Sequence, residues 1–225
     1  MKLKLIAVLY FIVGVLFIVF HYLNIEFLML FTKALIMPFL ALYFFLGMKQ
    51  TLNKFSYLIL FALFFSWGGD ILLQLIAYND SFFMLGLISF LIAHIFYIIA
   101  FTSIKKTQSV VMKQPILAIP FLIYGIGLIW FLLPDLDEMT IPVIVYATVI
   151  LFMTVMALNR RGNVSTVSFT LVFVGAALFT FSDTLIAINK FSYPFEASRF
   201  LIMSLYITAQ FLIVYGCLIQ EIKNI

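Results

Sequence analysis

The chain has 225 residues, of which 66% are hydrophobic and only 10% are charged, and its mean hydropathy is +1.24. Soluble domains are about half apolar and about one quarter charged, so this composition excludes a soluble globular domain and indicates an integral membrane protein. The formal net charge of +4 does not indicate nucleic-acid binding, because the basic residues lie in short connections between apolar segments. A single cysteine, Cys217, excludes an internal disulfide bond.

Eight apolar segments are long enough to cross a bilayer, which takes about 20 mostly apolar residues in a helix. The sequence therefore predicts an all-α polytopic membrane protein with one transmembrane domain, in which short connections make consecutive helices antiparallel neighbours. The first segment lacks a small-x-small cleavage site, so we expect a helix there and not a signal peptide. The expected helices cover residues 3–20, 27–46, 55–78, 82–103, 115–133, 141–158, 165–189 and 197–219.

Basic residues concentrate on one side of the predicted helices, and such loops usually face the cytoplasm. We therefore expect both termini in the cytoplasm. We also expect the membrane to be a bacterial inner membrane. Ten of the 13 basic residues are on this side: Lys2, Lys4, Lys49, Lys54, Lys105, Lys106, Lys113, Arg160, Arg161 and Lys223.

A short internal similarity is compatible with a duplication. The stretch SWGGDIL at 66–72 resembles TFSDTL at 180–185, and Ala93-His94 corresponds to Ala209-Gln210 in the following helix. Two four-helix halves in the same orientation would result, as in membrane folds built from parallel repeats.

Two aspartates, Asp70 and Asp183, lie inside predicted helices, where a charged carboxylate costs roughly 3 kcal/mol or more. At the helical rise, Asp70 is ~12 Å and Asp183 ~10 Å below the outer surface, so we expect both at a similar depth. Two carboxyls with different protonation states can act as general acid and general base, which favours hydrolytic chemistry. The alternative is that both aspartates form interhelical hydrogen bonds and have no catalytic role.

Other polar groups are expected near the aspartates. His94, with Tyr97 one turn further on, is either a packing residue or part of the site, and the set Asp70, His94 and Asp183 is a less favoured metal site. We expect a metal-independent site without a cofactor, because no HExxH or Cys-His spacing is present, and the lack of a GxSxG motif argues against a nucleophilic serine. Tyr206 and Gln210 share a stripe with Arg199 and Met203 at helical spacing.

Gly68 and Gly69 precede Asp70. They either permit close helix packing around the aspartate or give a ligand access to the backbone.

Three basic residues, Lys33, Lys190 and Arg199, lie at the opposite membrane side from the other ten. Each either extends toward lipid head groups or helps to hold a substrate phosphate. The second interpretation predicts an amphiphilic substrate whose reacting bond reaches down to the aspartates.

Five patterns in chain order resemble the YhhN-like lysoplasmalogenase family. Residues 86–97 are similar to its G-L-x-x-F-x-x-A-H-x-x-Y signature, and residues 69–73 to its G-D-x-x-L segment. GAALFTFSDTLIA resembles G-A-x-x-F-x-x-S-D-x-x-L-A, and YITAQFLI resembles Y-x-x-A-Q-x-L-I. Thr32-Lys33-Ala34-Leu35 resembles the family's T-K-P-L, with Ala34 in place of the usual proline.

The resemblance implies an eight-helix membrane hydrolase that cleaves the vinyl ether bond of lysoplasmalogens, without a metal, to a fatty aldehyde and a glycerophospho head group. The buried aspartates of the family match Asp70 and Asp183, which are therefore the expected catalytic residues. Local polarity alone favours Asp70 as the protonated one. The expected substrate-binding residues are Lys33, His94, Tyr97, Lys190, Arg199, Tyr206 and Gln210.

The expected partners are a lysophospholipid substrate and membrane lipids, with no nucleic acid and the oligomeric state left open. The alternative function is a proton-coupled transporter of a small molecule or lipid that uses the same carboxylates.

Overall fold

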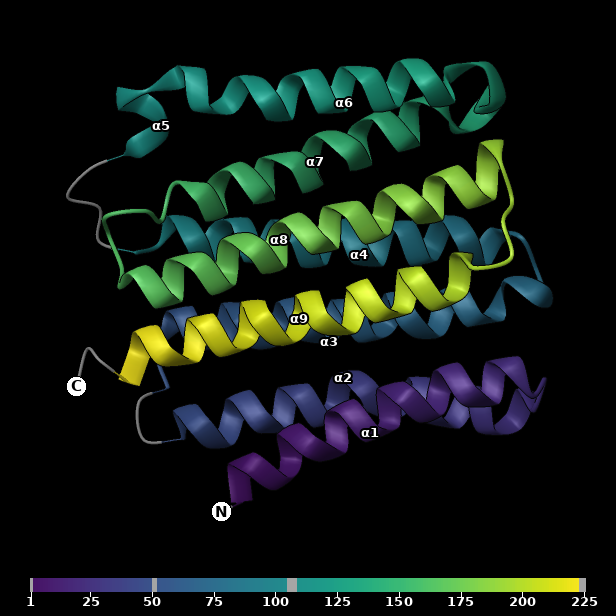
Figure 1. The fold of residues 1–225 in the computed structure, drawn as a ribbon, viewed down its shortest axis with the longest axis horizontal. Coiled ribbons are helices and arrows are strands. Elements are labelled where there is room, and N and C mark those ends of the chain that lie inside the picture. The colour runs from purple at the N-terminus through teal and green to yellow at the C-terminus, as the bar shows by residue number, and fades with distance from the viewer. Residues whose placement is uncertain (1, 50–51, 105–108, 223–225) are drawn as a thin grey trace. The chain divides into compact units, whose positions relative to one another are not determined.

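The structure is a computed structural model that describes residues 2–49, 52–104 and 109–222, with side chains described as far as residue 220. Three of the basic residues used for the orientation, Lys105, Lys106 and Lys223, lie outside the described residues. Regular structure in the described part of the chain is helical throughout (Figure 1). Eight helical segments within these residues are long and apolar enough to cross a membrane, which confirms the predicted fold class.

The chain folds into two compact units. Among the described residues, the first unit comprises those up to Ala100 together with residues 221 and 222, and the second unit is Phe101–Gln220. Because the boundary falls near the end of the fourth span, each unit holds four spans. This division coincides with the two four-helix halves that the internal similarity suggests.

The first unit contains four long helices: α1 (Lys2–Tyr22), α2 (Glu26–Met48), α3 (Lys54–Gln74), which continues into the 3₁₀ turn Leu75–Ala77, and α4 (Ser81–Thr102). Local chemistry explains where α3 begins, because Asn53 and Ser56 form a reciprocal capping box. The amide of Ser56 donates to Asn53 Oδ1 at 3.0 Å, and the amide of Asn53 donates to Ser56 Oγ at 3.3 Å. Two otherwise unsatisfied amides at the helix start are thereby bonded.

The second unit begins with a short helix, α5, and a 3₁₀ turn, which precede four longer helices. A π-helical turn, Ile188–Ser192, extends α8, and Ser165 caps the start of α8 by accepting a bond from the amide of Ser168 at 3.3 Å. The helices are α5 (Val110–Lys113), α6 (Ile119–Leu132), α7 (Thr140–Leu158), α8 (Thr166–Ala187) and α9 (Ser198–Ile222).

Glycines set the distance between neighbouring helices at several crossings, as is usual where membrane helices pack through small residues. A Cβ atom built on Gly69 would lie 2.5 Å from the Phe90 ring, and one on Gly68 would lie 2.8 Å from Ser89 Oγ. The glycine pair before Asp70 therefore permits close packing of α3 on α4, which confirms the packing interpretation.

The crossing of α8 and α9 is equally close. A Cβ on Gly175 would lie 2.8 Å from the Ala209 carbonyl oxygen and 2.9 Å from the Ile213 amide nitrogen. Both neighbours belong to the backbone, so the helices would have to separate to accept a side chain.

We predict that Gly175→Ala lowers the melting temperature of the purified protein in detergent. The matched control is Gly127→Ala in α6, where a built Cβ meets no atom of the described residues within 4 Å. Alanine has the higher helix propensity by up to about 1 kcal/mol, so the control should be neutral or stabilising. Equal melting temperatures for the two variants would contradict the close approach of α8 and α9.

Candidate active site

A buried ion pair links α2 and α3 in the first unit. Lys33 Nζ lies 3.0 Å from Asp70 Oδ1, and the two side chains are 8% and 2% exposed. The ammonium group also lies over the Phe17 ring of α1, 5.0 Å from its centroid. Lys33, which we predicted to be near a substrate phosphate, is thus placed beside Asp70. A pair this deeply buried strongly resists the removal of either partner, because the remaining charge would be uncompensated.

A second interaction between the same two helices lies one turn away and has its cause in Pro38. Proline has no amide hydrogen, so Pro38 leaves the carbonyl of Ala34, four residues earlier, without its usual helical donor. The indole of Trp67 supplies that donor, with Nε1 2.9 Å from Ala34 O. Since Ala34 follows Lys33 and Trp67 precedes Asp70 by three residues, this bond holds α2 and α3 together next to the ion pair.

Two tyrosines extend this centre. Tyr10 of α1 and Tyr97 of α4 are both fully buried, and Tyr10 lies near Asp70. His94, one turn before Tyr97, is also fully buried. The first centre, defined as Tyr10, Lys33, Trp67, Asp70 and Tyr97, therefore draws side chains from all four helices of its unit.

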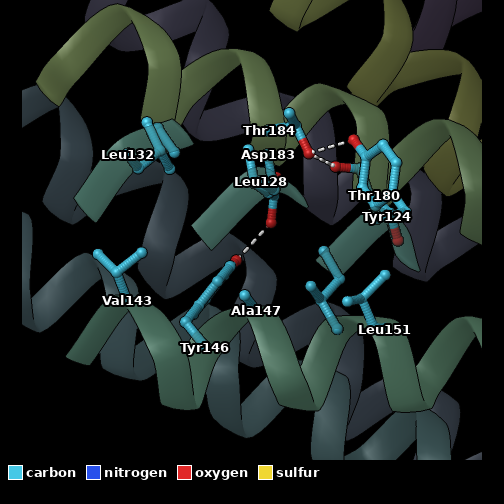
Figure 2. A pocket seen from close by; sticks show the side chains of 12 residues that line it. Tyr124, Leu128, Leu132, Val143, Tyr146, Ala147, Leu151, Thr180, Asp183 and Thr184 are labelled. Carbon is cyan, nitrogen blue, oxygen red and sulfur yellow. Dashed lines mark hydrogen bonds between the residues drawn. The ribbon is translucent and has the colours of Figure 1, made fainter. Parts of the chain in front are cut away.

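The second unit has its own carboxyl centre, at Asp183 of α8. The hydroxyl of Tyr146 in α7 donates a hydrogen bond to Asp183 Oδ2 (Figure 2). Next to Asp183 along α8, Thr184 Oγ1 is 2.7 Å from the hydroxyl of Tyr124 in α6 and donates to the Thr180 carbonyl at 2.9 Å. Three helices thus meet around Asp183.

A cavity of about 30 Å³ adjoins Asp183. It is large enough for a water molecule, which needs about 10–15 Å³. Aliphatic side chains, among them Leu128, Leu132 and Val143, form much of its wall (Figure 2). The polar side chains that contribute to the lining are Tyr124, Tyr146, Thr180, Asp183 and Thr184.

The predicted binding residues of the second unit fall into two groups. Tyr206 and Gln210 of α9 are buried, and Tyr206 packs edge-on against Phe179 of α8 with ring centroids 5.3 Å apart. Lys190, in the π-helical turn, and Arg199, in the first turn of α9, are both exposed. Asp70 and Asp183 belong to separate units, so their common depth stays a prediction.

Sequence reasoning missed the aromatic partners Tyr10, Trp67 and Tyr146. Each is one aromatic residue among many in an apolar helix, and only Trp67, spaced three residues from Asp70, had a signal in the sequence. Arg160, which we counted as a loop residue for the orientation, is also buried. Its Nη2 donates to Ser168 Oγ at 3.0 Å and to Gln220 Oε1 at 2.6 Å.

Within the described residues, no group of three or more His, Cys, Asp or Glu side chains is arranged to hold a metal ion. Metal independence nevertheless stays a prediction, because it concerns the reaction and not this arrangement.

The fold and the two centres define an eight-span integral membrane protein with one buried or half-buried carboxyl centre in each unit. The chain belongs to the YhhN family, whose family model matches residues 28–217. It is 31% identical over 182 residues to mouse (Mus musculus) lysoplasmalogenase TMEM86B, a match that covers 80% of this chain and 72% of the mouse protein.

The chain is also 32% identical over 131 residues to lysoplasmalogenase TMEM86B of the pig (Sus scrofa), a match that covers 58% of this chain. In that match the chain spans about half of the pig protein, 52% of its length. No solved structure matches the chain significantly.

Trp67→Phe should destabilise the protein by about 1–3 kcal/mol, because it leaves the Ala34 carbonyl without a donor. Pro38→Ala restores a backbone amide that can donate to that carbonyl, so Trp67→Phe should cost much less in the Pro38→Ala background. The measurement is a double-mutant cycle of unfolding free energies in detergent. An equal cost in both backgrounds would contradict the role given to Trp67.

Lys33→Met should destabilise the protein by about 3–5 kcal/mol, since it leaves Asp70 buried without its counter-charge. The double variant Lys33→Met/Asp70→Asn removes both charges and should recover most of the lost stability. Unfolding in detergent measures both effects. If the stability lost in the double variant equals the sum of the losses in Lys33→Met and Asp70→Asn measured separately, the two residues do not interact as an ion pair in the membrane protein.

Proposed function

We propose that this YhhN-family protein is a membrane hydrolase that cleaves the vinyl ether bond of lysoplasmalogens or of a closely related lysolipid. The observation that carries the proposal is a carboxyl centre in each unit, Asp70 beside Lys33 and Asp183 beside Tyr146, in a chain whose relatives are named lysoplasmalogenases. The reaction needs groups that donate a proton and stabilise positive charge, and carboxyls supply both.

The chemistry consumes one water molecule. A proton adds to the vinyl carbon that does not bear oxygen, and the ether carbon becomes an oxocarbenium ion. Water adds to that carbon and loses a proton, which gives a hemiacetal. The hemiacetal hydroxyl then loses its proton while the bond between this carbon and the glycerol oxygen breaks, and the glycerol oxygen takes up a proton. The products are a fatty aldehyde and the glycerophospho head group.

The surroundings of the two aspartates suggest a division of roles. If Asp70 were protonated, the ammonium group of buried Lys33 would lose its counter-charge, so Asp70 suits the role of the carboxylate that stabilises the cation. Asp183 has a neutral partner, Tyr146, and lies at a cavity, so it can carry a proton without breaking an ion pair. We therefore propose Asp183 as the proton donor, which differs from the assignment that local polarity favours.

In this proposal, the other predicted residues have different roles according to whether they are exposed or buried. Lys190 and Arg199, which are exposed where α8 ends and α9 begins, are proposed to bind the phosphate of the head group. Lys33 acts through Asp70 instead. The other predicted residues are buried, His94 and Tyr97 in the first unit and Tyr206 and Gln210 in the second, and each pair is proposed to bind substrate within its own unit.

The protein is an integral membrane protein. We propose further that both termini face the cytoplasm, on the basis of the basic residues counted above. The membrane is proposed to be a bacterial inner membrane.

The test is release of a fatty aldehyde from a lysoplasmalogen by the purified full-length chain in detergent. Asp70→Asn and Asp183→Asn should each lower the rate by at least about 100-fold, the usual contribution of a general acid or base. Asp135→Asn, at an exposed position after α6, is the matched control and should keep full activity.

Full activity in both aspartate variants would overturn the proposed catalytic residues. Absence of aldehyde release from ether and ester lysolipids, together with substrate uptake into proteoliposomes, would favour the transporter.

A further inference from the structure

A groove of about 730 Å³ runs along the second unit between α6 and α7. The two helices pack side by side (Figure 1), and α6 is the least buried of the spans. Gly125, Ile126 and Trp130 line one side, and Ala147, Leu151 and Phe152 line the other. These residues lie within spans, so the groove is within the hydrocarbon region and not in water.

The chemistry of the lining selects a hydrocarbon ligand. Among the described residues that line the groove, only Thr148 has a side-chain hydroxyl, and it donates to the Ile144 carbonyl of its own helix at 2.8 Å. None of these lining residues has a charged side chain. The only other strong hydrogen-bonding side-chain group in this lining is the indole N–H of Trp130, so a ligand with several polar groups would lose most of its hydrogen bonds to water.

The groove runs along most of the two spans. Its lining extends from Ala118 to Leu133 along the span that contains α6 and from Ile144 to Met156 along α7, or about 22 Å and about 18 Å at the helical rise. The hydrocarbon core of a bilayer is about 30 Å thick and a chain in one leaflet spans about 15 Å, so the groove is long enough for one hydrocarbon chain.

The groove is next to the cavity beside Asp183. Ala147 and Leu151 line the groove and also line the cavity beside Asp183 (Figure 2). Leu151 rests on Gly125, since a Cβ built there would lie 2.5 Å from Leu151 Cδ1. Ala147 and Leu151 thus lie between groove and cavity, and Leu151 lies where α6 has no side chain.

We propose that this groove binds the single hydrocarbon chain of the lysolipid substrate and directs it toward Asp183. The proposal rests on the proposed function for the identity of the lipid. Bulk lipid would occupy any such surface, but a groove that shares its wall with the carboxyl cavity places a chain next to the group that we propose as the proton donor. Leu151 then separates the bound chain from the cavity.

The test is photolabelling of the full-length chain in detergent with a lysophosphocholine that carries a diazirine midway along a non-cleavable ether chain. Labelled residues are mapped by mass spectrometry. We expect label on the lining of α6 and α7, and at least a fivefold reduction by excess unlabelled lysophosphocholine but not by a diacyl phosphatidylcholine.

A matched pair of variants tests the location. Ile126 and Ile123 are neighbouring isoleucines of α6 with similar exposure, 69% and 65%, but only Ile126 lines the groove. Ile126→Trp should lower labelling roughly tenfold, the effect of displacing about two methylene groups from an apolar site. Ile123→Trp should leave it unchanged. Both positions are exposed, so neither substitution disturbs the core.

Three labelling results would overturn the groove assignment: label outside the groove, equal competition by the diacyl lipid, or equal effects of the two tryptophan variants. A fourth is an Ile126→Cys variant that forms disulfide-linked dimers and then takes up no label, which would mean that a second copy of the chain occupies the groove. Photolabelling needs no turnover. Groove labelling without aldehyde release would therefore overturn the proposed function alone, and aldehyde release without groove labelling would overturn the groove alone.

Discussion

The ion pair between Lys33 and Asp70 is the interaction on which the first unit depends. A charge in a hydrocarbon environment costs several kcal/mol unless an opposite charge and hydrogen bonds compensate it. With a 3.0 Å separation, each of these residues compensates the other, and the Phe17 ring covers the ammonium group. The packing of α1, α2 and α3 therefore depends on this pair, because loss of either charge would leave the other uncompensated.

Next to that pair, a proline in α2 creates a second contact between α2 and α3. Pro38 interrupts the hydrogen bonds of α2, and the freed Ala34 carbonyl becomes the acceptor for Trp67. Membrane helices tolerate proline when a neighbouring helix satisfies the freed backbone group. Here the neighbour is the helix that carries Asp70, so satisfying the backbone also fixes the position of the carboxyl relative to Lys33.

The second unit compensates its carboxyl, Asp183, in a different way. Asp183 has a neutral tyrosine partner, a small cavity and only partial burial, so its environment does not demand that it stay charged. One carboxyl bound by a counter-charge and another with a neutral partner form an asymmetric set. Under the proposed function, this asymmetry suits Asp183 to carry a proton and Asp70 to stay charged.

The sequence by itself determined the membrane class, the eight spans and the two aspartates, because length, hydropathy and a buried charge are properties that a single segment carries. It also indicated packing at Gly68 and Gly69. It could not show that Lys33 pairs with Asp70, because the position of a lysine near a helix end is equally compatible with a contact to lipid head groups. Nor could it select Tyr10 or Tyr146 from 11 tyrosines. Those choices depend on which helix faces meet, and only the tertiary structure decides that, because interhelical contacts join residues distant in sequence.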